Sequence, residues 1–178
     1  FFQGSKNAYA DDGFRRVVFA GNLAKYQGVD YLLQAFRHVL EVRRDIRLVL
    51  VTESPTTELL QDAATLGIGD CIETLAADLS RLPDLLASAD VLVNPRTQCP
   101  GVPQKLLNYM AAGAPIVGFA GSTRYIVDGR SGIVVPNEDV RAFAAGILRL
   151  LDDHANAGQI GLAAQEYARK SFTWSATA

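Results

Sequence analysis

The sequence is poor in the residues on which metal sites and disulfide frameworks depend. Its 178 residues include two cysteines, Cys71 and Cys99, and two histidines, His38 and His154. Neither cysteine belongs to a C-x-x-C pair, and two thiols are too few for a disulfide framework in a chain of this length. The histidines fall in helical patterns far apart in the sequence. We therefore expect no metal site, and two reduced thiols in a cytoplasmic protein.

The chain also lacks an excess of charge and a long apolar run. It has 17 Lys and Arg against 19 Asp and Glu, a net charge of −2. A nucleic-acid surface needs clustered basic residues to neutralise phosphates, so we expect no nucleic-acid partner. No apolar run approaches the roughly 20 residues of a membrane span. No signal peptide is visible either.

The best-known cofactor motifs are missing as well. No G-x-G-x-x-G follows the first apolar run, and no G-x-x-x-x-G-K-[ST] occurs. These absences argue against a dinucleotide-binding enzyme and a P-loop nucleotidase. A serine hydrolase of the G-x-S-x-G type is disfavoured in the same way. We expect no cofactor.

The apolar residues that are present alternate between strand-like and helix-like patterns. Hydrophobic residues make up 49% of the chain and charged residues 20%, ordinary values for one globular domain. Short, mostly continuous apolar runs predict strands buried on both faces. They cover Arg16–Ala20, Arg47–Thr52, Cys71–Leu75, Val91–Asn94, Pro115–Phe119 and Gly132–Val135. Helical periodicities separate them, which predicts an α/β fold with a Rossmann-like, doubly wound parallel sheet of about six strands.

The two ends of the chain differ from its middle in the structure that their residues predict. Residues 1–5 look like the remnant of a cleaved affinity tag, which would make the chain a piece of a longer protein. Residues 6–14 are predicted to be a linker or disordered start. The domain itself is predicted over residues 15–174, with an extra helix at Asn156–Ser171 after the sheet is complete.

Two loops at the carboxyl ends of predicted strands are candidates for ligand binding. In Gly21–Gly28, a glycine at each end allows a ligand close to the backbone, and Lys25 adds a mobile positive charge. In Asn94–Lys105, Pro103 suits the first turn of a helix, whose free N–H groups form an anion cradle. The alternative for each loop is an ordinary strand-to-helix turn.

At these loops the sequence resembles the group 1 retaining glycosyltransferases, which consist of two Rossmann-like domains in the GT-B fold. The resemblance lies in Gly21–Phe36, Gly101–Val117 and Tyr125–Pro136, in that order, and in the region of Trp174. It implies that the chain is the C-terminal, nucleotide-sugar-binding half of such an enzyme. The intact enzyme would transfer a hexosyl group from a nucleotide diphosphate sugar to an acceptor hydroxyl, with retention of configuration.

The sequence departs from the family pattern at charged positions. The family has two glutamates eight positions apart, and Pro100 and Asn108 stand in their places. Asn108 can still hydrogen-bond ribose hydroxyls through its amide, whereas a proline cannot replace a carboxylate that contacts the sugar. Asn22 and Gln27 replace the Arg and Lys of the first loop, which leaves Lys25 and Lys105 as the nearest cations.

The resemblance also implies the site and its partners. We expect no catalytic side chain within this half, and a nucleotide base against Leu75–Asp78. The expected partners are the nucleotide diphosphate sugar, the missing N-terminal domain, and a membrane surface touched peripherally by the full-length enzyme. The predicted donor-binding residues are Gly21, Asn22, Lys25, Gln27, Thr97, Gly101, Val102, Lys105, Leu106 and Asn108.

Two alternatives stay open. In the first, the lost glutamates and cations mean that catalysis has disappeared and the chain is a nucleotide-binding or scaffold module. In the second, the fold serves another reaction, because sugar-nucleotide epimerases and glycogen-phosphorylase-type enzymes share this architecture. We expect the isolated chain to bind nucleotide weakly and to transfer nothing.

Overall fold

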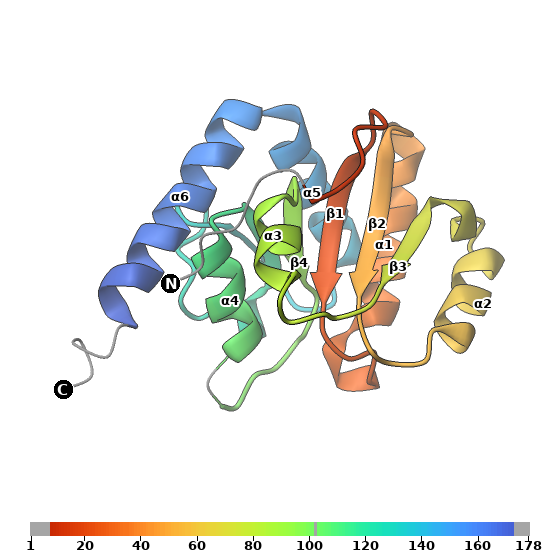
Figure 1. The fold of residues 1–178 in the computed structure, drawn as a ribbon, viewed down its shortest axis with the longest axis horizontal. Helices are drawn as coiled ribbons and strands as arrows, with labels where there is room; N and C mark the ends of the chain where they lie inside the picture. Colours follow the sequence, from red (N-terminus) through yellow and green to blue (C-terminus); the bar gives the residue numbers. More distant parts are fainter. Residues whose placement is uncertain (1–7, 102, 173–178) are drawn as a thin grey trace.

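The computed structural model describes residues 8–101 and 103–172, and its centre is a six-stranded parallel sheet (Figure 1). The strand order is β3-β2-β1-β4-β5-β6, so the chain builds outward from β1 in one direction and then returns to build in the other. This order confirms the predicted Rossmann-like, doubly wound fold. The strands are β1 Arg15–Ala20, β2 Ile46–Val51, β3 Ile72–Leu75, β4 Val91–Asn94, β5 Ile116–Phe119 and β6 Ile133–Val135.

Helices cover both faces of the sheet. In Figure 1, α3 and α4 lie in front of the strands and α1 and α5 behind them, while α2 flanks the β3 edge. Short 3₁₀ turns complete the connections within the described residues: η1 Lys25–Gln27, η2 Gly69–Cys71 and η3 Ala120–Ser122. The helices are α1 Val29–Val42, α2 Thr57–Thr65, α3 Leu82–Ala87, α4 Gln104–Ala112, α5 Val140–Asp152 and α6 His154–Ser171.

The core consists of two layers, one on each side of the sheet. In β1, Val17 and Phe19 face the layer beneath α1 and α5, whereas Val18 and Ala20 face the layer beneath α3 and α4. Because both faces are covered, the strand reads as a continuous apolar run. The first half of α6 packs in one layer and its second half in the other, so α6 crosses the edge of the sheet. The extra helix predicted after the sheet is confirmed. No helix within the described ranges is long and apolar enough to cross a bilayer.

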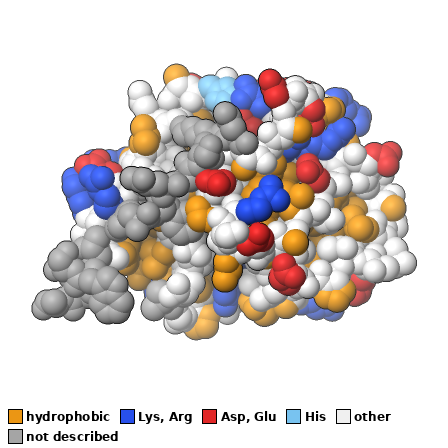
Figure 2. Space-filling view, viewed as in Figure 1, with side chains coloured by type: hydrophobic (Ala, Val, Ile, Leu, Met, Phe, Trp, Pro, Cys, Tyr) orange, Lys and Arg blue, Asp and Glu red, His pale blue; other side chains and the backbone are white. Residues whose placement is uncertain are grey.

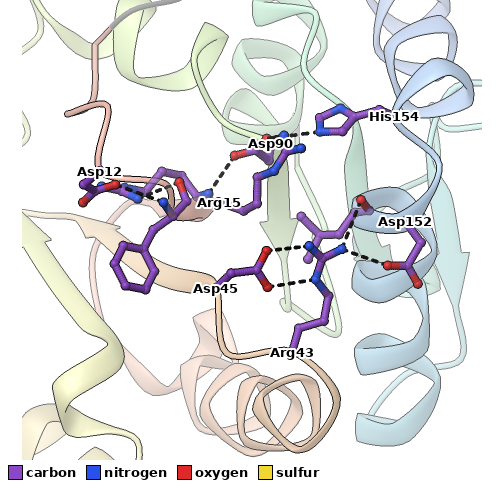
Figure 3. Close-up of polar contacts among 10 residues, drawn as sticks. Asp12, Arg15, Arg43, Asp45, Asp90, Asp152 and His154 are labelled. Carbon is purple, nitrogen blue, oxygen red and sulfur yellow. Dashed lines mark hydrogen bonds and ion pairs between the residues drawn. The ribbon is translucent and has the colours of Figure 1, made fainter.

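The amino-terminal edge of the sheet carries a polar network (Figure 3). The Asp90 carboxylate accepts hydrogen bonds from Arg15 Nη1 and from the backbone N–H of Arg16, both at 2.7 Å. His154 Nε2 lies 3.9 Å from the same carboxylate. Asp90 therefore joins the starts of β1 and β4 and the first residue of α6.

We expect Asp90→Ala to lower the free energy of unfolding by about 2 kcal/mol, because the Arg16 N–H and the Arg15 guanidinium lose their acceptor. Urea denaturation followed by circular dichroism measures the change. Asp152→Ala is the matched control: its side chain is 63% exposed, and its partner Arg43 keeps Asp45. The control should lose less than about 1 kcal/mol. Equal losses in the two variants would show that the Asp90 network contributes no more than a surface ion pair.

The segment before β1 is predicted as a linker or disordered start, and residues 8–14 form no helix or strand. They nevertheless contact α3 and the residue that follows it: Tyr9 Oη donates to the Leu85 carbonyl oxygen at 2.9 Å, and the Ala8 N–H donates to Oγ of Ser88, the C-cap, at 3.0 Å. The domain limits at residues 15 and 174 stay predictions. Residues 1–5 and Trp174 lie outside the described residues.

Candidate functional site

The candidate site lies at the carboxyl ends of β1 and β4, the neighbouring strands at which the strand order reverses. The chain leaves β1 toward one face of the sheet and leaves β4 toward the other, so the two following loops diverge and open a crevice. A cavity of about 240 Å³ occupies this position. It is lined by Gln27, Asn94, Arg96, Cys99, Pro103, Gln104, Lys105, Leu106 and Ser122.

The loop after β1 is held against the loop after β4 by a close backbone contact. Gly28 adopts a left-handed conformation with φ of +71°, and a Cβ atom there would lie 2.1 Å from the Pro95 carbonyl oxygen. Only glycine fits such a position. This contact carries Gln27, the last residue of η1, into the cavity, where it is 6% exposed. Asn22 instead braces the loop itself, since its amide donates to Tyr26 Oη at 2.9 Å and accepts from Ala24 N at 3.2 Å.

The start of α4 forms one wall of the cavity. Pro103 is the N-cap rather than a first-turn residue, and the first helical hydrogen bond runs from Leu107 N to the Pro103 carbonyl oxygen at 3.0 Å. The N–H groups of the first turn, residues 104–106, therefore have no acceptor within the helix. They provide the positive end of the helix dipole, which favours an anion.

Lys105 contributes a side-chain amine to the same cavity. Its Nζ donates a 2.7 Å hydrogen bond to Gln27 Oε1 and lies 3.8 Å from the centre of the Phe19 ring. It also lies over Gly21, where a Cβ atom would come within 2.8 Å of Nζ. Burial, which disfavours the charged amine, and secondly the positive charge of Arg96 lower the pKa of Lys105 to about 7.

Tyr109, one turn after Lys105, fixes α4 to the end of β1. It is fully buried, and its Oη accepts a 2.7 Å hydrogen bond from the Ala20 N–H. The hydroxyl also donates to the Ala20 carbonyl oxygen at 3.4 Å. Ala20 is the last residue of β1, so this contact sets the position of the helix start relative to the loop that follows β1.

The far side of the cavity is formed by the segment after β5. Asn94 Nδ2 donates to Ser122 Oγ at 3.0 Å, which joins the end of β4 to η3. Gly121 packs so closely that a Cβ atom would lie 1.7 Å from the Thr97 carbonyl oxygen. Asn137 bridges the two segments, since it accepts from Gly121 N at 2.9 Å and donates to the Thr97 carbonyl oxygen at 3.0 Å.

Comparison with known proteins identifies the fold and the family. Residues 14–153 match the family described as Glycosyl transferases group 1. The chain belongs to this family. It is 30% identical over 168 residues to the GDP-mannose-dependent alpha-(1-6)-phosphatidylinositol monomannoside mannosyltransferase of Mycolicibacterium smegmatis, covering 89% of this chain and 44% of the relative. It is also 30% identical to the D-inositol 3-phosphate glycosyltransferase of Corynebacterium diphtheriae, covering 91% of this chain and 40% of that relative. The chain thus spans less than half the length of these relatives.

Solved structures place the fold in one half of the GT-B architecture. The C-terminal domain of a group 1 family protein from Francisella tularensis superposes with a TM-score of 0.84 at 18% identity, covering 97% of this chain and 96% of that domain. HepE of Anabaena in complex with UDP gives a TM-score of 0.81 at 20% identity, covering 90% of this chain and 45% of HepE. Identities this low establish the fold alone.

The structure of this group 1 domain brings together only some of the predicted donor-binding residues. Gln27, Lys105 and Leu106 line the cavity, and Gly21 lies against the Lys105 amine. Gly101 is exposed on the loop before α4, and its carbonyl oxygen accepts from Arg124 Nη2 at 2.7 Å.

The other predicted residues lie apart from that cavity. Lys25 and Thr97 line a second hollow of about 630 Å³ beside α1 and α2, together with the acidic Asp30 and Glu58. Asn108 is half-buried on α4 and lines neither hollow. Val102 lies outside the described residues.

Sequence reasoning missed several residues that line the cavity. Asn94 carried a usable signal, because it is a polar residue that ends an apolar strand at the ligand-binding edge of the sheet. Arg96 and Cys99 lie in the predicted loop, but nothing in the sequence indicates that they face inward. Ser122 carried no local signal, because it enters the cavity only through the pairing of β4 with β5.

Proposed function

We propose that this domain binds the donor of a glycosyltransferase, a nucleotide diphosphate sugar, with the diphosphate at the start of α4. Joined to its N-terminal domain, it would transfer a hexosyl group to an acceptor hydroxyl with retention of configuration. The observation that carries the proposal is the convergence of the first-turn N–H groups of α4 and the Lys105 amine on one cavity at the switch point of the sheet.

The charge of the cavity supports a diphosphate as its ligand. The charged side chains among its described lining residues are Arg96 and Lys105, both positive. A helix N-terminus with basic side chains binds phosphate groups, because N–H donors and cations both point at the anion. An uncharged ligand could accept hydrogen bonds from these donors but would leave the positive charge of the cavity unbalanced.

The same groups suit the chemistry of sugar transfer. Negative charge grows on the leaving diphosphate as its bond to the sugar breaks. The N–H groups of α4 and Lys105 are held in place before the reaction, so they stabilise that charge without reorganising. We expect the acceptor site and further catalytic groups on the N-terminal domain, whose contribution is positioning of the acceptor.

The relatives favour a hexosyl donor. The Mycolicibacterium relative is described as GDP-mannose-dependent, and the Anabaena protein HepE has been solved with UDP-glucose. These descriptions apply to those proteins, and the base that this domain binds stays open. A base against Leu75–Asp78, a cytoplasmic location, and peripheral membrane association of the full-length enzyme stay predictions.

Titration of the chain with UDP, GDP and ADP by isothermal calorimetry tests the proposal. We expect weak but selective binding of one of the three nucleotides, because the diphosphate is common to them and the base distinguishes them. Selective binding supports donor binding at this site and names the nucleotide of the donor. Absence of binding of all three at millimolar concentration would contradict the proposal.

The second candidate is a scaffold or binding module without catalysis. The presence of Pro100 and Asn108 where the family has glutamates favours it. An assay with the longer protein, including its N-terminal domain, separates the two candidates. Transfer from the selected donor by the longer protein, and none by this chain, is the result we expect. Turnover by the isolated chain would contradict our view that it is only the donor half.

A further inference from the structure

The Lys105 amine is surrounded by groups that hold it in place without balancing its charge. Its Nζ has one hydrogen-bond acceptor among the described residues, the amide oxygen of Gln27 at 2.7 Å. The Phe19 ring lies on one side at 3.8 Å, and the backbone of Gly21 lies on another. An ammonium group can donate three hydrogen bonds, so two remain for a ligand.

The elements packed around this amine present no carboxylate to it among the described residues. β1 contributes Phe19, η1 contributes Gln27, and η3 contributes Ser122. The loop after β4 contributes Arg96, whose positive charge opposes a second cation, and the Cys99 thiol. Partial burial and a nearby cation, without an anion, disfavour the charged form of this amine.

We propose that Lys105 takes up a proton from solvent as a diphosphate enters the cavity, and that Gln27 is the positioning residue that aims its amine at the ligand. This inference rests on the proposed function, because the diphosphate supplies the missing negative charge. It adds that donor binding is linked to protonation of the protein, and it assigns to Gln27 a role that acts through Lys105.

The direction of the linkage follows from the free and bound states. In the free domain the pKa of Lys105 is lowered to about 7, first by burial and then by Arg96. A diphosphate beside the amine favours its charged form and raises that pKa. Binding therefore takes up almost no proton well below pH 7, where the amine is already charged. It takes up a proton most fully between about pH 7 and the raised pKa of the complex, and affinity falls as pH rises through this range.

Gln27 suits the positioning role because its own place is fixed. It ends η1, directly before Gly28, whose contact with the Pro95 carbonyl oxygen leaves no space for a side chain. The amide oxygen accepts from the amine without forming an ion pair, so the charge remains available to a ligand. A carboxylate at position 27 would keep the amine charged but compete with the diphosphate.

The experiment is carbon-detected NMR titration of ¹³C-labelled lysine in the whole chain. The sequence has four lysines, Lys6, Lys25, Lys105 and Lys170, and loss of one signal in Lys105→Met assigns the amine of interest. We expect this signal to titrate near pH 7, well below the ordinary lysine value of about 10.4. Gln27→Glu should raise the titration midpoint of Lys105 and Gln27→Met should lower it. Lys25→Met, which changes another residue of the loop that carries Gln27, should leave the titration midpoint of Lys105 unchanged.

Addition of UDP-glucose or GDP-mannose then tests the linkage, since the diesterified phosphates of both probes stay ionised throughout this pH range. The probe that binds should raise the titration midpoint of Lys105, and calorimetry in two buffers of different ionisation enthalpy should count the proton taken up. A Lys105 midpoint at the ordinary lysine value of about 10.4, or one unmoved by Gln27→Glu, would overturn the inference. Binding without proton uptake would also overturn it while leaving the proposed function intact. Failure of both probes and of all three nucleotides to bind would contradict the proposed function instead.

Discussion

We expect Gly28→Ala to lower the free energy of unfolding by about 3 kcal/mol. Alanine would be strained in the left-handed conformation, and its Cβ would clash with the backbone of the loop after β4. The residue has φ of +71°, and its Cβ would lie 2.1 Å from the Pro95 carbonyl oxygen. To relieve that clash, the loop after β1 must move away from the loop after β4. Gln27 then moves away from Lys105, so we also expect binding of the selected nucleotide to be lost. Urea denaturation and calorimetry measure the two effects.

Gly129→Ala is the matched control for this variant. Gly129 has the same φ of +71°, but a Cβ there would meet nothing within 4 Å. Its free energy of unfolding should fall by only about 1 kcal/mol, the cost of holding alanine in a left-handed conformation. The difference between the two variants isolates the contact with Pro95. A similar loss in both would mean that this contact does not hold the two loops together.

The fold could be predicted from the sequence because its signals are local. Most of the six strands are largely apolar segments of three to six residues with a helical pattern or a turn beside them, and β3, Ile-Glu-Thr-Leu, is the exception. Boundaries moved by one residue where a turn takes over: Cys71 belongs to η2, and β3 begins at Ile72. The strand order was not in the sequence pattern itself, since alternation predicts parallel pairing but does not say which strand β4 joins. Pairing of β4 with β1 creates the crevice.

The site could be predicted only at the level of its loops. Lys105 and Gln27 are 78 positions apart, and their contact depends on both the β1–β4 pairing and the hydrogen bond from Ala20 to Tyr109. Which residue of the first loop faces the cavity also depends on η1. One 3₁₀ turn carries Gln27 inward and leaves Lys25 on the exposed side. The charges along the loop do not indicate which of these two residues faces the cavity.

Lys105→Met is therefore the substitution that tests directly how the Lys105 charge contributes to donor binding. Loss of a charged hydrogen-bond donor to a diphosphate costs about 2–3 kcal/mol, which corresponds to roughly 30- to 150-fold weaker binding. We expect this loss at about pH 6, where the wild-type amine is charged. Calorimetry with the nucleotide selected by the wild type measures it. Lys25→Met, whose side chain lines the second hollow, should weaken binding less than about threefold.

The stability of the same variant decides how a loss of binding is interpreted. Lys105→Met replaces a desolvated amine by an apolar group of similar length that can pack on Phe19, so we expect the free energy of unfolding to stay the same or rise. Weaker binding in an equally stable protein assigns the loss to the charge. The difference in binding affinity between this variant and the wild type should also shrink above about pH 8, because the wild-type amine must then take up a proton to bind. Equal weakening by Lys25→Met would place the diphosphate away from the start of α4. A loss that does not change with pH would contradict proton uptake by Lys105 and leave that placement intact.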